Sequence, residues 1–318
     1  MTGATGFVGR HVRFALRAAG YHVRCATRSP EAAKARDPQS DWVRFDLDDA
    51  ESVRPALEGC QSALFFVHAM GGGSGGDYPE RERQEALRFR AAAEDVGLRR
   101  VVYLGGVTPQ GKKPSKHLQS RLDTGATLRG GAVSTIELRA AMVIGAGSAG
   151  WQMVHDIARR LPAMLLPRWL RNVSWPVYID DVAAACLASL AKSGQESAWY
   201  ELSGPERISH RDLMRRVAGQ LGKKPLLLNV PVLTPRLSSY WIAMVTSTEY
   251  ALIRELVEGI RHDLDPSGPL IWELIPDYAR LDLDTSISRA LRDQRYVGSV
   301  TSEHQHELTE VGRAFKLP

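Results

Sequence analysis

TGATGFVGRH, from Thr2 to His11, carries glycines at three-residue spacing. In a tight strand-to-helix turn, Gly3 can take a backbone angle closed to other residues, and Gly6 lacks the Cβ that would meet a bound phosphate. Gly9 lets the following helix, expected from about Phe7 to Ala19, close on the sheet, so that phosphates lie at its positive end. The pattern therefore predicts a pyrophosphate-binding turn made by Gly3, Thr5, Gly6, Phe7, Val8 and Gly9.

A strand of about five apolar residues should precede the first glycine of such a turn and lie at the centre of the sheet. Only Met1 and Thr2 stand there. A missing central strand would leave its neighbours with unpaired backbone groups, at about 1–3 kcal/mol for each buried one. We therefore expect the natural start to lie upstream, with Met1 read from a valine codon inside the strand. The intact mass of protein from its native source tests this.

The composition is that of an ordinary globular protein, with 44% of the 318 residues hydrophobic and 24% charged. Attraction to nucleotide phosphates accounts for the mild net charge of +5 without nucleic-acid binding. Cys25, Cys60 and Cys186 stand far apart in apolar stretches, which indicates free thiols in a reducing compartment, and we expect a cytoplasmic protein. The longest apolar stretches fall well short of the ~20 residues that span a bilayer, so no transmembrane segment is expected.

Strand-like and helix-like segments alternate through the first half of the chain. Strands are expected at residues 21–27, 42–45, 63–68, 100–104 and 134–144, with helices at 50–58, 79–96 and 117–128. This alternation predicts an α/β fold, a Rossmann-type doubly wound parallel sheet, in residues 1–149. Residues 150–295 should form a smaller substrate lobe, with about 176–202 returning to the sheet, and 161–175 should be a loop. Residues 296–318 are polar and expected to be a disordered tail.

Several strings together resemble the extended, atypical short-chain dehydrogenase/reductases, in particular the NmrA-like NAD(P)-binding branch. The resemblance runs from Thr2 to about Leu291. The matching strings are TGATGFVG (2–9), FDLDD (45–49), FFVHAMG (65–71), VVYLGG (101–106), HLQSR (117–121), LRAAMVIGAGS (138–148), RLPAMLLPRW (160–169) and PVYIDDVA (176–183). It implies that the first block binds pyrophosphate and that Asp46 and Leu47 approach the adenine.

The cofactor is expected to be NADP(H), with NAD(H) as the alternative. An acid at the end of the second strand would hold the ribose hydroxyls of NAD and repel a 2′-phosphate. Arg28 stands there and could bond a phosphate, with help from Arg10; an exposed strand-end charge is the alternative. His68 and Gly105 end later strands, where the chain should pass the cofactor. For His68, a histidine at the edge of the core is an equal interpretation.

Catalysis is the open question, because active members of the wider family use a Ser after the fifth strand and a Tyr-x-x-x-Lys on the next helix. Here Gly105 and Gly106 replace the Ser, and His117 and Arg121 stand in place of the Tyr and Lys. In one interpretation His117 is a general acid near neutral pH, although Arg121, one turn along, lowers its pKa. In the other, both residues only bind cofactor, as in NmrA-like redox sensors or the NADPH-holding subunit of respiratory complex I.

No metal site is expected, because the nine histidines show no HxxxH or HExxH spacing and the acids Asp180 and Asp181 fit a helix start. The apolar side chains expected to line the lobe are Met153, Leu161, Met164, Leu165, Trp169 and Trp175. The leading hypothesis is NADP(H)-dependent hydride transfer to a small apolar carbonyl or quinone-like substrate. The alternative is a non-catalytic NADP(H)-binding sensor or assembly subunit that acts through a protein partner.

Overall fold

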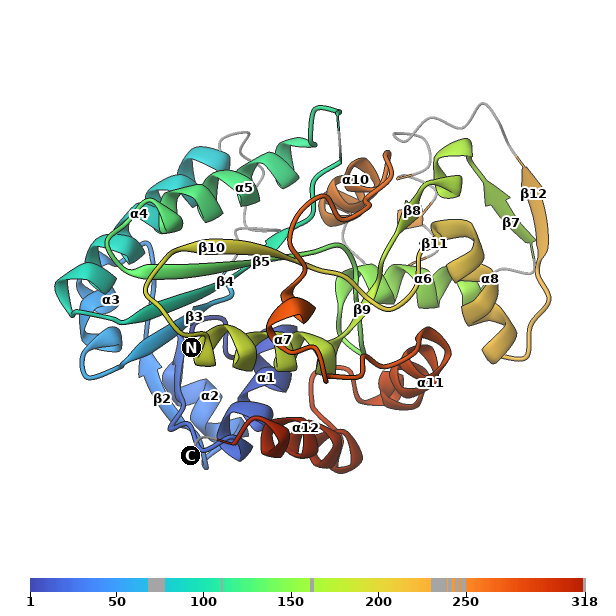
Figure 1. The fold of residues 1–318 in the computed structure, drawn as a ribbon. Helices are drawn as coiled ribbons and strands as arrows, with labels where there is room; N and C mark the ends of the chain where they lie inside the picture. The colour runs from blue at the N-terminus through green and yellow to red at the C-terminus, as the bar shows by residue number, and fades with distance from the viewer. Residues whose placement is uncertain are drawn as a thin grey trace.

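The computed structural model describes residues 1–67, 78–109, 111–160, 163–229, 239, 242–243, 246 and 250–316. Strands and helices alternate through its first half, as predicted (Figure 1). These elements are α1 (Phe7–Ala18), β1 (Arg24–Thr27), α2 (Pro30–Arg36), β2 (Asp41–Arg44), α3 (Ala50–Leu57), β3 (Ser62–Phe65), α4 (Tyr78–Asp95), β4 (Arg100–Gly106), α5 (Lys116–Arg129) and β5 (Ser134–Ala140). No helix in the described ranges combines the length and apolar character needed to cross a bilayer.

The main sheet is parallel. β10 (Ala198–Leu202), β5, β4 and β3 pair in that order, and β1 pairs with β2. Met1 and Thr2 lie between β1 and β3: the Thr2 amide donates to the Leu64 carbonyl at 2.9 Å, and the Ala26 amide donates to the Met1 carbonyl at 2.9 Å. The first two residues thus stand at the place expected for the central strand. The predicted doubly wound α/β fold is confirmed.

Helices cover both faces of this sheet. α3, α4 and α5 lie on one face, while α1 and α7 (Ile179–Ala191) lie on the other, with α12 (Ser302–Ala314) packed outside them (Figure 1). Because successive strand residues point to opposite faces, Val102 and Leu104 of β4 join the core around α1, whereas Val101 and Tyr103 join the core around α4. Burial on both faces explains why β4 is apolar after its first residue, Arg100.

The second half of the chain builds a smaller lobe beside the carboxyl ends of the strands (Figure 1). Its further elements are β6 (Val143–Ile144), α6 (Ala149–Arg160), β7 (Ala163–Leu166), η1 (Arg168–Arg171), β8 (Val173–Ser174), β9 (Val177–Tyr178), β11 (Ile208–Ser209), α8 (His210–Gln220), β12 (Leu226–Asn229), α10 (Tyr250–Gly259), η2 (Ile271–Leu274), α11 (Leu283–Asp293) and η3 (Gln294–Tyr296). Lobe residues such as Trp151 and Met214 belong to the same core cluster as Val102 of the sheet.

Two segments differ from the sequence expectations. Residues 161–175, expected to be a loop, contain β7 and β8, because their backbones pair with β12 and β11 from much later in the chain. Residues 296–318, expected to be disordered, contain α12. Thr301 caps this helix, and it buries His304, Leu308 and Gly312 in a stripe four residues apart. A polar segment can form a helix when one narrow stripe packs against its neighbours.

Candidate active site

The glycine turn has the geometry that its sequence predicts. Gly3 has φ +61°, and a Cβ added there would lie 2.8 Å from the Phe66 carbonyl oxygen. A Cβ on Gly9 would lie 2.7 Å from Ala4 Cα. α1 starts directly after Gly6, with no side-chain cap and no acid in its first turn. Its first amides therefore lack partners within the helix and fit an anion such as a dinucleotide pyrophosphate.

A cavity of about 420 Å³ joins this turn to the carboxyl end of β4, the start of α5 and the smaller lobe. It brings together many of the residues that the sequence singled out. Those that line it are Gly3, Gly6, Phe7, Val8, Gly9, Gly105, His117, Arg121 and Met153. The two candidate catalytic residues and the glycine turn therefore border one space.

His117 stands in the first turn of α5, which Ser115 caps by accepting a hydrogen bond from the Leu118 amide at 3.3 Å. Its Nδ1 is buried and finds no hydrogen-bond partner within the described part of the chain. Burial, and then the nearby charge of Arg121, lower the pKa of His117 to about 3. The imidazole is therefore neutral at pH 7, which differs from the expectation of a general acid near neutral pH. A neutral ring can still donate or accept a hydrogen bond.

The Arg121 side chain is held against the end of β4. Its Nη2 donates to the Leu104 carbonyl at 2.6 Å, and its Cδ and Nε lie 3.6 Å from where a Cβ on Gly106 would stand. A Cβ at this position would touch the Arg121 side chain at ordinary contact distance and would meet Leu118 Cδ2 more tightly, at 3.0 Å. Tyr103 is fully buried, and its hydroxyl donates to the Arg121 carbonyl at 3.1 Å, so it packs rather than reaching the cavity.

Other predicted site residues lie outside the cavity lining. Thr5 accepts a hydrogen bond from Arg10 Nη1 through its carbonyl, at 3.0 Å. Arg28 is exposed directly after β1, and Asp46 and Leu47 follow β2, with the Leu47 side chain in the core around α4. His68 falls outside the described residues.

The lobe lining was predicted less well than the turn. Trp169 and Trp175 are half-buried and do not line the cavity, while Leu161 and the side chains of Met164 and Leu165 fall outside what is described. The apolar residues that line the lobe side instead include Met142, Val154, Met214, Leu256, Ile260 and Leu264, together with the polar residues Ser174 and His210. The apolar spacing of α8 could have indicated Met214; the others meet only through tertiary packing.

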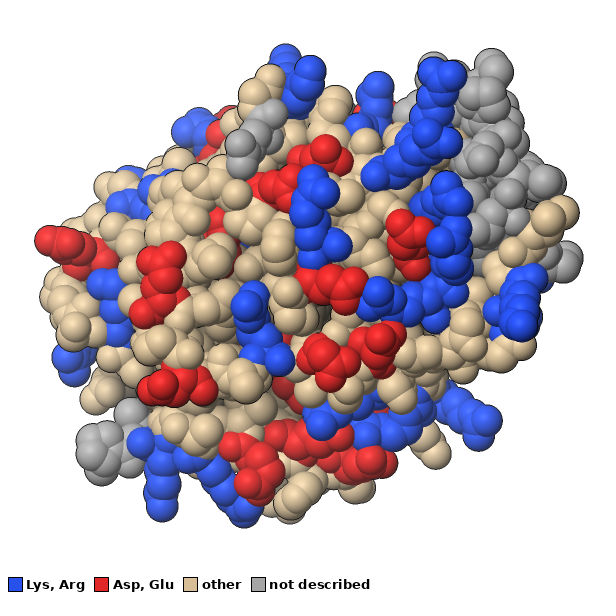
Figure 2. Space-filling view, turned by 45° about the vertical axis from the view of Figure 1, so that its right-hand side comes forward, with Lys and Arg blue, Asp and Glu red and all other residues tan. Residues whose placement is uncertain are grey.

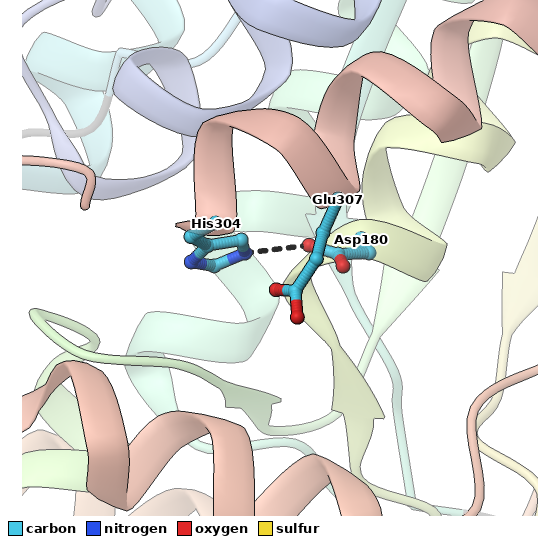
Figure 3. Close-up of side chains that lie close together, drawn as sticks. All are labelled: Asp180, His304 and Glu307. Atoms are coloured by element: carbon cyan, nitrogen blue, oxygen red, sulfur yellow. Dashed lines mark hydrogen bonds and ion pairs between the residues drawn. The ribbon is translucent and has the colours of Figure 1, made fainter. Parts of the chain in front are cut away.

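Asp180, His304 and Glu307 form a cluster whose ligand atoms lie within 4.8 Å of one another (Figure 3). His304 Nε2 lies 2.7 Å from Asp180 Oδ1 and Nδ1 lies 3.0 Å from Asp293 Oδ2. Burial alone would lower the pKa of His304, but these two carboxylates outweigh it and raise the pKa to about 9. A protonated ring bonded at both nitrogens has no lone pair for a metal, so the cluster is a buried ion pair that fastens α12 to α7 and α11.

Comparisons with known proteins agree with this geometry. Residues 3–131 match the family model described as NAD(P)H-binding. The ceramide reductase of Caulobacter vibrioides is 24% identical over 285 residues, covering 87% of this chain and 88% of that protein. Triphenylmethane reductase of Citrobacter sp. complexed with NADP(H) superposes with a TM-score of 0.70 at 18% identity, covering 91% of this chain and 98% of that one.

The NADPH-dependent quinone oxidoreductase of Escherichia coli, complexed with NADPH, gives the same TM-score of 0.70, also at 18% identity and with 91% and 98% of the two chains covered. These structural likenesses show the fold, and the family model shows the nucleotide-binding part. Together they show an NAD(P)H-binding domain in residues 3–131, and they agree with the resemblance of the motifs to the NmrA-like atypical short-chain dehydrogenase/reductases.

Proposed function

We propose that the chain is an NADP(H)-dependent reductase that acts on a small apolar carbonyl or quinone-like substrate. The observation that carries this proposal is the single cavity bordered by the glycine turn, by His117 and Arg121, and by apolar side chains of the lobe. The similar proteins support it, because one is named for ceramide, a lipid, and another for quinone reduction.

The residues at the nucleotide end fit NADP(H) better than NAD(H). The glycine turn and the start of α1 would hold the pyrophosphate, and Asp46 and Leu47 would approach the adenine. Arg28 follows β1 at the place where an acid would select NAD, and its charge favours a 2′-phosphate. Arg10 lies beside the turn, with its Nη1 on the Thr5 carbonyl, and adds positive charge there.

When bound, NADPH supplies a hydride to the carbonyl carbon of the substrate. The C=O electron pair then moves onto the oxygen, and the buried guanidinium of Arg121 stabilises that negative charge. His117, neutral because of its lowered pKa, holds the same oxygen through a ring N–H rather than by giving up its proton. A proton from water completes the alcohol.

The test compares His117→Ala with Ser115→Ala, which loosens the same helix start but keeps the imidazole. Loss of one hydrogen-bond donor to a developing oxyanion should lower kcat about 10²-fold with an unchanged Kd for NADPH, whereas Ser115→Ala should keep most of its activity. Because His117 stays neutral, kcat/KM should show no histidine inflection between about pH 5 and 8. Unchanged turnover in His117→Ala would contradict the role of this residue.

The replacement of the usual Tyr and Lys by His117 and Arg121 also favours a second candidate, a non-catalytic NADP(H) sensor or assembly subunit. Tight NADPH binding with no oxidation of NADPH by ketones or by menadione, together with NADPH-dependent binding of a protein partner, would favour that candidate.

A further inference from the structure

The lobe side of the cavity contains two buried polar side chains that the proposed hydride transfer does not use. His210 is the first residue of α8 and is 5% exposed. Ser174 is the last residue of β8 and is 1% exposed. Both line the cavity, among methionine, leucine and isoleucine side chains.

One polar atom of each of these side chains is buried without a hydrogen-bond partner among the described residues. Across the ranges that the structure describes, neither His210 Nε2 nor Ser174 Oγ has a hydrogen-bond partner. A buried polar atom without a partner destabilises the free protein, because the atom has given up its hydrogen bonds to water and gained none. A ligand that offers hydrogen bonds at this place removes that cost, whereas a purely hydrocarbon ligand leaves it in place.

Backbone pairing fixes the two side chains close to each other. β8 and β11 are antiparallel, with Ser174 opposite Ile208, two residues before His210. The His210 amide donates to the Asn172 carbonyl at 3.1 Å, which continues this pairing to the start of α8. Diagonal neighbours on an antiparallel ladder lie about 7–8 Å apart or less. One small polar group placed between them can therefore bond both.

The charges around these side chains indicate an uncharged ligand group. Burial lowers the pKa of His210 to about 4, with Asp263 opposing the change, so the ring is neutral at pH 7. The charged side chains that line the cavity are Arg121, at the end of β4, and Glu255, whose carboxylate repels anions. A hydroxyl or carbonyl fits a neutral imidazole and a serine, whereas a carboxylate or phosphate would lack a cation beside it.

The outer side of α8 is charged and differs from the side that faces the cavity. Figure 2 shows basic and acidic side chains interleaved over this side of the molecule, and Asp212, Arg215 and Arg216 of α8 take part in ion pairs there. The same helix buries His210, Leu213, Met214 and Val217. α8 thus separates a charged outer side from an apolar inner side on which His210 is the polar exception.

We propose that His210 and Ser174 form a second binding point, which recognises an uncharged hydroxyl or carbonyl group on the apolar body of the substrate, away from the reacting carbonyl. This assignment rests on the proposed reductase function for its choice of substrate. It adds that the substrate is an apolar molecule with two polar positions, of which one is reduced and the other is held.

The test measures binding without turnover, by calorimetric titration of the full-length protein saturated with 1,4,5,6-tetrahydro-NADP, a cofactor analogue that neither gives nor accepts a hydride. The ligands are decan-2-one and a series of decan-2-ones hydroxylated at successive carbons. Recovery of a hydrogen bond worth about 1.4 kcal/mol predicts about tenfold tighter binding for at least one hydroxylated member than for decan-2-one. His210→Phe and Ser174→Ala should abolish this preference while decan-2-one still binds.

Two control variants separate recognition from damage to the fold. Ser209→Ala removes the hydrogen bond that Ser209 Oγ accepts from the Asp212 amide at 3.0 Å, and it should lower stability but keep the tenfold preference. His210→Gln keeps a polar group and should keep part of the preference. A preference that survives in His210→Phe, or no preferred member in the whole series, would overturn the proposal.

The same experiment distinguishes failure of this proposal from failure of the proposed function. A hydroxyl preference that depends on His210, seen without any ketone reduction by NADPH, would keep the binding point and refute the reductase. Ketone reduction with equal binding of all ligands to wild type and His210→Phe would keep the reductase and refute the binding point.

Discussion

The buried ion pair of His304 predicts how the stability of the protein depends on pH. His304 lies between Asp180 and Asp293, and its side chain is 2% exposed. Its folded-state pKa of about 9 exceeds the ordinary value of 6.5. A histidine with a raised pKa contributes its full stabilisation below the unfolded pKa and loses it as pH rises through the folded pKa. The contribution should therefore be complete below about pH 6.5 and absent above about pH 9.

The size of the effect follows from the difference between these two pKa values. At about 1.4 kcal/mol for each pKa unit, a rise from 6.5 to about 9 corresponds to about 3 kcal/mol of unfolding free energy. Solvent screening does not reduce this figure much, because His304, Asp180 and Asp293 are all buried. Arg289 and Arg292 keep the carboxylates paired when the ring loses its proton, at 3.4 Å from Asp180 and 3.0 Å from Asp293.

The assay is urea unfolding of wild type and His304→Gln at pH 6.5 and pH 9.5. The variant cannot titrate at this position, so the difference between the two proteins cancels the groups they share. The account predicts that wild type is more stable than His304→Gln by about 3 kcal/mol at the lower pH and that most of this difference is lost at the higher pH. An equal difference at both pH values would refute the reasoning, since it would mean that His304 is neutral in the folded protein.

The glycine turn and the charge at the nucleotide end give two more predictions. Gly9→Ala places a Cβ 2.7 Å from Ala4 Cα. We therefore expect the substitution to lower the free energy of unfolding by about 1–3 kcal/mol, measured by thermal unfolding. It should also weaken NADPH binding, measured by titration. Gly219→Ala is the matched control, because its Cβ would point into open space. Replacing a glycine within a helix by alanine should raise the free energy of unfolding by about 0.5–1 kcal/mol. Arg28→Glu should weaken NADPH binding about 10–100-fold with little effect on NADH, while Arg36→Glu, an exposed change of equal charge, should affect neither. Equal losses for both nucleotides would exclude Arg28 as the phosphate contact.

The sequence predicts the glycine turn well because the geometry of the turn is local. Gly3, Gly6 and Gly9 lie within seven consecutive residues, and the steric reasons for Gly3 and Gly9 hold in the structure, while the reason for Gly6 stays a prediction. The alternation of strands and helices likewise follows from short apolar segments that need no distant partner to be recognised.

The lobe side of the cavity was not predictable in the same way. Ser174 and His210 line one cavity because β8 pairs with β11, and neither two-residue strand has a hydrophobic pattern that could indicate this pairing. α12 escaped prediction because its buried stripe contains His304 and Gly312 beside Leu308, and only the facing carboxylates make a buried histidine favourable. Long-range polar pairing leaves no periodicity in a single sequence.

The most direct test of the central claim is a single-turnover experiment with NADPH that carries deuterium at the transferable position. The full-length protein is mixed with the labelled NADPH and with the decan-2-one series, and mass spectrometry follows the carbinol carbon of any alcohol formed. The account predicts deuterium on that carbon in wild type and about 10²-fold slower transfer in His117→Ala. NADPH that binds tightly yet transfers no deuterium to any member of the series would contradict it.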